Sequence, residues 1–115
     1  MKNEIVECSK DFAVRIIRLS KFMDEKKMFT LSRQIIRSGT SIGANVHEAQ
    51  SAETKKDFAH KMNIALKEAR EVEYWLDIVC KAEIIPEIRL ADLRIELDEI
   101  TRMLVSIIKT TRKSL

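Results

Sequence analysis

Apolar residues recur at steps of three and four along four segments of the chain, and short polar or proline-containing stretches separate these segments. This spacing places the apolar side chains on one face of an α-helix. The pattern predicts helices over residues 3–25, 31–51, 55–83 and 87–112. Short connections favour antiparallel neighbours. We therefore predict one all-α domain over residues 1–115, an antiparallel up-down-up-down four-helix bundle.

Residues at the predicted helix ends support these boundaries. Thr30 is a candidate N-cap for the second helix, and Thr54 directly precedes the third. Pro86 suits the first turn of the fourth helix, because its fixed φ is compatible with a helix start. The basic segment from Lys109 to Lys113 ends that helix and is expected to fray.

The second predicted helix contains a run of small and polar residues, from Ser38 to Asn45, with poor helix propensity. Gly39 and Gly43 lie four residues apart in this run, which makes a flat strip on one helix face. Such a strip lets another backbone approach closely, so we predict a tight helix crossing. The alternative is a helix broken or kinked at the glycines.

A second contact surface is predicted beside the apolar seam of the third helix. Ile64 and Trp75 lie on a flank of that helix among carboxylates, outside its main apolar stripe. We interpret Ile64, Trp75, Gly39 and Gly43 as candidates for contacts between copies of the chain.

Composition narrows the class of protein without identifying a partner. The 115 residues carry a formal net charge of +3, which is mildly basic, and include only two glycines and one proline. No uninterrupted apolar run is long enough for a membrane span, and Met1–Ser9 does not resemble a signal peptide. We expect a cytoplasmic protein in which Cys8 and Cys80 are buried free thiols.

The charges are distributed unevenly along the chain. Residues 12–47 contain seven Lys or Arg and two Asp or Glu, a local +5, whereas residues 71–99 contain three and nine, a local −6. If the basic faces of the first two helices adjoin, their arginines form a patch suited to phosphate groups. An ordinary solvated surface with ion pairs is the alternative. The candidate nucleic-acid-binding residues are Arg15, Arg18, Arg33 and Arg37.

No catalytic constellation is recognisable, so we predict that the protein is not an enzyme and uses no metal or cofactor. A di-iron bundle would need Glu-x-x-His pairs, and the chain has none. Neither His47 nor His60 has an Arg four to six residues before it, as a helical RNase of the HEPN type would need.

Four polar residues are expected to form a structural network near the core or at a subunit contact. Glu68 and Glu71 share one helix face, and Glu48 follows the small-residue strip closely. An acid–base pair is the alternative interpretation of these carboxylates. The predicted network comprises Asn45, Glu48, Glu68 and Glu71.

The segment Arg33–Ala49 resembles the family of 23S rRNA intervening-sequence proteins, also called S23-like. The third helix agrees with the same family at Lys56–Phe58, Ala65–Ala69 and Tyr74–Leu76. The resemblance implies a bacterial four-helix bundle without established enzymatic activity, related to the accessory variability determinant of diversity-generating retroelements. It also implies a homopentamer whose basic surface is proposed to bind nucleic acid and, in the retroelement branch, a reverse transcriptase. The matching signature positions are Ser38, Gly39, Ile42, Asn45, Glu48, Glu68 and Glu71.

Three functional hypotheses follow from the sequence. The first is a homo-oligomeric accessory protein that binds RNA or DNA. The second is a protein-interaction scaffold that uses the flank near Trp75 or the acidic region Glu83–Glu99. The third is an RNA-processing enzyme that depends on His47 or Glu48.

Overall fold

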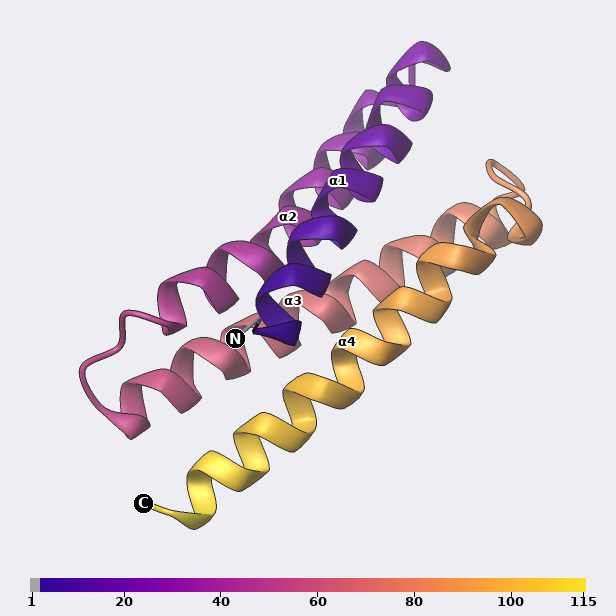
Figure 1. Ribbon diagram of the computed structural model, residues 1–115. Coiled ribbons are helices and arrows are strands. Elements are labelled where there is room, and N and C mark those ends of the chain that lie inside the picture. Colours follow the sequence, from indigo (N-terminus) through magenta and orange to yellow (C-terminus); the bar gives the residue numbers. More distant parts are fainter. Residues whose placement is uncertain (1–2) are drawn as a thin grey trace.

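Four antiparallel helices make up the fold in the computed structural model, which describes residues 3–115. They are α1 (Glu4–Glu25), α2 (Phe29–Ala49), α3 (Lys55–Lys81) and α4 (Glu87–Lys113). Figure 1 shows the chain reversing direction at each connection, so the helices run up, down, up and down. Each helix packs on its neighbours in the chain, and α4 returns beside α1. The all-α, up-down-up-down prediction is confirmed.

The capping geometry confirms one predicted helix start and corrects another. The Thr54 hydroxyl accepts a hydrogen bond from the Asp57 amide at 3.0 Å, so Thr54 is the N-cap of α3. The prediction for Thr30 is wrong, because α2 already begins at Phe29 and its N-cap is Met28. The chain turns sharply before that point, with Lys27 in the left-handed region at φ 62°. Such a tight reversal leaves no room for a cap at Thr30.

The other boundaries move by only a few residues. Pro86 is the N-cap of α4 instead of a residue in its first turn. α2 ends at Ala49, and α3 ends at Lys81 before the left-handed residue Glu83. The helix α4 continues to Lys113, so its basic end is helical within the described residues.

The apolar stripe of each helix forms a common core. Fully buried side chains come from every helix; among the largest are Phe12, Ile42, Met62, Leu76 and Leu104. Burying one such side chain stabilises the folded state by about 1.5–3 kcal/mol. The core therefore accounts for the helical periodicity on which the fold prediction depends.

The glycine strip forms the crossing between α1 and α2. A Cβ atom added at Gly39 would lie 2.6 Å from Cγ2 of Ile16, and one at Gly43 would lie 3.1 Å from the Ser9 carbonyl oxygen. The predicted tight crossing is confirmed, and α2 is one continuous helix without a break at the glycines. Their assignment to a contact between copies is corrected, because both glycines face α1 of the same chain.

The seam between α1 and α4 is the most open side of the bundle. These two helices touch each other far less than the other three neighbouring pairs do. Within residues 3–115, no helix is long and apolar enough to cross a membrane. Surface pockets follow the α1–α4 seam, and charged residues of both helices line them.

Candidate nucleic-acid interface

The four arginines predicted to form one patch lie on two different sides of the bundle. Arg15 and Arg18 of α1 face the seam with α4, where they line the same pockets. Arg37 of α2 lies against α3 instead and pairs with Glu68 and Glu71. The single patch is therefore wrong, because the core-facing glycines of α2 fix the rotation of that helix and direct Arg37 away from α1.

Arg33 adds no second member to a joint patch. It lies one turn before Arg37 and is exposed on α2, outside the pockets that Arg15 and Arg18 line. Only the α1 half of the predicted patch therefore belongs to a concave surface.

Arg15 and Arg18 line two pockets between α1 and α4. The larger of the two, about 390 Å³, is also lined by Asp11, Glu96 and Glu99, whereas the smaller is mainly basic.

The seam between α1 and α4 thus has an acidic part and a basic part. The acidic part is the cavity of about 390 Å³, where Asp11, Glu96 and Glu99 lie near Cys8. Burial raises the pKa of Glu96 above its ordinary value, although Arg15 contacts it at 2.6 Å and opposes this shift. Burial and the neighbouring carboxylates likewise raise the pKa of the Cys8 thiol. This part of the seam is a poor site for a phosphate group.

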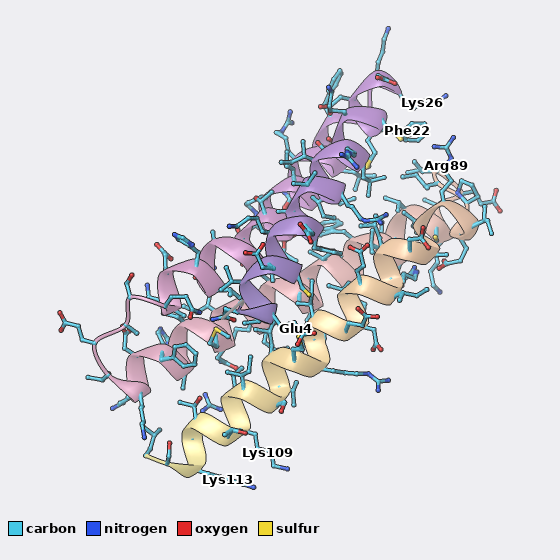
Figure 2. All side chains as sticks on the ribbon, in the orientation of Figure 1. Glu4, Phe22, Lys26, Arg89, Lys109 and Lys113 are labelled. Atoms are coloured by element: carbon cyan, nitrogen blue, oxygen red, sulfur yellow. The ribbon has the colours of Figure 1, made fainter. Side chains whose placement is uncertain are left out.

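The basic part, named the Phe22 pocket below, lies further along the seam toward the α1–α2 turn. It has a volume of about 250 Å³. The Arg89 guanidinium carbon lies 4.7 Å from the centroid of the Phe22 ring, and the Lys26 ammonium lies 5.6 Å from it. Figure 2 shows these three labelled residues close together at that end of the molecule. The pocket is lined by Arg15, Arg18, Leu19, Phe22, Arg89, Asp92 and Leu93.

A second basic surface, named the α3–α4 groove, lies near the C-terminal end of α4. It has a volume of about 580 Å³ and an aliphatic floor, and four of its eight lining residues are cationic. Figure 2 shows Lys109 and Lys113 on the last turns of α4. The lining residues are Asn63, Leu66, Arg70, Val105, Ile108, Lys109, Arg112 and Lys113.

The cations of the α3–α4 groove are uncompensated. No carboxylate is among its lining residues, and within residues 3–115 none of the four cations lies within 4.0 Å of a carboxylate oxygen. In contrast, Arg15, Arg37 and Arg94 each pair with an acidic side chain. The groove is therefore the clearest local excess of positive charge on the described surface.

Sequence reasoning missed this groove because it treated the end of α4 as frayed. Lys109, Arg112 and Lys113 are spaced by three and four residues, so a continuing helix places them on one side. That spacing was the available signal. The position of Arg70 beside them depends on how α3 and α4 align, which the helical period alone does not determine.

The predicted polar network exists in part, between α2 and α3. Arg37 pairs with Glu71, and its other terminal nitrogen lies 3.7 Å from Glu68. The Trp75 indole donates a hydrogen bond to Glu71 at 3.1 Å. Trp75 is half-buried in this network, and its contact with another copy of the chain stays a prediction. Ile64 is also half-buried.

Glu68 is the least satisfied member of the network. Its Oε2 atom is buried without a hydrogen-bond partner. Burial, with a smaller contribution from Glu71, raises the pKa of Glu68, and Arg37 opposes that rise. The charge of Arg37 is thus used to hold two carboxylates in place, which removes it from the candidate phosphate contacts.

The other two predicted network residues lie outside this cluster. The Asn45 amide donates to the Ser41 carbonyl oxygen at 2.8 Å within α2, so its inclusion in the network was wrong. Glu48 is exposed, and its carboxylate lies 4.0 Å from the Lys61 ammonium. Short side chains such as that of Asn45 often bond to their own helix, which sequence spacing does not reveal.

Comparison with known proteins identifies close similarities. A family model described as 23S rRNA-intervening sequence protein matches residues 1–106. The chain is also similar to a crystal structure from Bacteroides thetaiotaomicron, described as a protein with unknown function from the S23 ribosomal protein family. The two are 48% identical, the match covers 91% of this chain and 98% of that one, and the TM-score is 0.89. Among proteins with curated descriptions, none matches the sequence.

The family match ends before the last turns of α4. Lys109, Arg112 and Lys113 follow residue 106, where the matched region stops. Three of the four cations of the α3–α4 groove therefore lie outside the part of the chain that the family model describes.

Proposed function

Since the chain belongs to the 23S rRNA-intervening sequence protein family, we propose that it is a non-enzymatic, homo-oligomeric accessory protein that binds RNA or DNA through basic surfaces. The observation that carries this proposal is the α3–α4 groove, where the described residues supply four cations and no lining carboxylate. Phosphate groups are the natural counter-charge for such a surface, because they are always ionised near neutral pH and accept several hydrogen bonds.

The groove suits a phosphate backbone in its chemistry as well as its charge. Arg70 and Arg112 each offer a planar fork that can donate two parallel hydrogen bonds to one phosphate. Lys109 and Lys113 add mobile point charges beside them. Contacts of this kind position a nucleic acid without reading its sequence. Binding through the groove should therefore tolerate many sequences.

Salt dependence tests this mechanism. Each phosphate that a cation neutralises releases counterion, so the logarithm of affinity falls with the logarithm of salt concentration by about 0.9 per contact on duplex DNA. The variant Arg70→Gln/Arg112→Gln should weaken binding and reduce the magnitude of this slope by about 2. Fluorescence anisotropy with a labelled duplex measures both quantities.

A matched control separates the groove from the overall charge. Lys10 and Lys81 are exposed cations outside both basic surfaces, so Lys10→Gln/Lys81→Gln removes the same charge elsewhere. The control should retain the wild-type slope. Equal losses in both variants, or no loss in either, would remove the groove from the proposal, and absence of binding by the wild type would end it.

Self-association is the second part of the proposal. Ile88 and Ile95 are 83% and 59% exposed on α4, seven residues apart and therefore on one side of the helix. We take these two uncovered side chains as the candidate contact with another chain. Sedimentation at micromolar concentration should give a mass several times 13.3 kDa, and a monomer would contradict self-association.

A protein-interaction scaffold is the second candidate function. Ile88 and Ile95 lie within the acidic region that the sequence identified, which suits a partner protein with an apolar and basic surface. A partner that remains bound after nuclease treatment at high salt, and is lost in Ile88→Glu/Ile95→Glu, would favour this function over nucleic-acid binding.

A further inference from the structure

The Phe22 pocket differs from the α3–α4 groove because it contains an aromatic ring. Phe22 and Leu93 belong to different helices and both line the pocket, so apolar and charged side chains meet in it. Phe22 is half-buried, and Arg89 of α4 lies over its ring. Within residues 3–115, the α3–α4 groove is lined by cations and aliphatic side chains but by no aromatic ring. The two basic surfaces should therefore favour different parts of a nucleic acid.

The arrangement of Arg89 over Phe22 provides a stacking surface. A guanidinium held against a ring loses part of its freedom, and its other face can take a planar group. Unpaired nucleobases stack on both aromatic rings and guanidinium planes. A base that enters here would lie with one face against the Phe22 ring or the Arg89 guanidinium. A phosphate group would need no such planar surface.

The polar groups of the pocket match the remaining parts of a nucleotide. Arg18 has no carboxylate within 4.0 Å among the described residues, so its charge is available for a phosphate. Arg15, in contrast, already pairs with Glu96. Among the residues that the structure describes, Asp92 is the one carboxylate that lines the pocket, and it can accept a hydrogen bond from an N–H group on a base edge. The pocket thus offers an apolar ring, donors and one acceptor.

We propose that the Phe22 pocket binds an unpaired nucleotide of a single strand, with the base against Phe22 and Arg89 and a phosphate on Arg18. This inference rests on the proposed nucleic-acid binding and adds a preference for strands with accessible bases. Bases in a duplex are stacked and paired, so they cannot enter a pocket of about 250 Å³ between two helices. A duplex would contact the rim through its phosphates alone.

Two matched substitutions test the pocket, and both keep the positive charge. Arg89→Lys removes the guanidinium plane in the Phe22 pocket, and Arg112→Lys makes the same change in the α3–α4 groove. The probes are a labelled single-stranded RNA of about 12 nucleotides, which is within the range of a single-strand site, and the duplex of the same sequence. Arg89→Lys should weaken single-strand binding about tenfold and leave duplex binding unchanged, since only the single strand loses a stacked base.

The outcomes separate this inference from the proposed function. Arg112→Lys should leave the ratio of single-strand to duplex affinity at its wild-type value. Phe22→Leu, which keeps an apolar side chain at this half-buried position, should lower that ratio as Arg89→Lys does. Equal weakening of both probes by Arg89→Lys, or no weakening of either, would overturn the pocket and leave the proposed function standing. Failure of the wild type to bind either probe would overturn both.

Discussion

Replacing Gly39 with alanine tests the crossing of α1 and α2, on which the rotation of α2 depends. The added Cβ atom would lie 2.6 Å from Cγ2 and 2.7 Å from Cγ1 of Ile16. Real Cβ atoms do not approach other carbon atoms so closely, so one helix must shift. Because Ile16 is fully buried, its side chain cannot relieve this contact by turning into solvent.

Two opposing contributions set the expected change in the free energy of unfolding. Alanine favours the helix over glycine by about 1 kcal/mol. Overpacking a core typically costs about 1–3 kcal/mol. This contact is severe and involves the branched part of a buried side chain, so we expect the upper half of that range. The net loss of stability should be about 1–2 kcal/mol.

Urea unfolding followed by circular dichroism measures this loss, with every variant at one protein concentration because self-association links stability to concentration. Ala44 is exposed on the same helix, so Ala44→Gly measures the helix-propensity contribution alone. Ile16→Ala should cost less in the Gly39→Ala background than in the wild type, since the new methyl group fills part of the space. If Gly39→Ala instead stabilises the protein by about 1 kcal/mol, the close crossing does not exist.

Two further predictions concern Glu68 and the cap of α3. Burial raises the pKa of Glu68 above its ordinary value of 4.5, so the folded protein binds this proton more tightly than the unfolded chain does. The contribution of Glu68 to stability therefore falls as the pH rises from that value through the raised pKa. Thermal melts should show a smaller decline over this range in Glu68→Gln, and equal pH profiles would contradict the assignment. Thr54→Ala should lower the free energy of unfolding by about 1 kcal/mol through loss of the N-cap, whereas Thr54→Ser should change it little; equal effects would exclude the cap.

The helices and the glycine crossing were predictable because each depends on local spacing. Apolar steps of three and four locate a helix, and two glycines four residues apart mark a flat face whatever lies opposite. Thr30 shows the limit of this reasoning, since a threonine before an apolar run suits an N-cap only if the preceding turn leaves room for it. Left-handed Lys27 places the start of α2 one residue before Thr30 instead.

The candidate sites were less predictable because they depend on how helices align and rotate. The sequence placed Arg15 and Arg18 on one face correctly, but their neighbour across the seam is Arg89 of α4 and not Arg37 of α2. No local spacing relates Arg18 to Arg89. Their proximity follows from the return of the last helix beside the first.

The sparse contact between α1 and α4 has a consequence for the dynamics of the bundle. Two helical hairpins, each with extensive internal packing, are joined mainly through α2 and α3. Local opening should therefore begin along the α1–α4 seam, where backbone amides will exchange with solvent sooner than those of α2 and α3. A ligand that touches Arg18 and Arg89 together would tie the first helix to the last and slow this exchange. Binding in this small pocket would thereby change how readily the whole bundle opens.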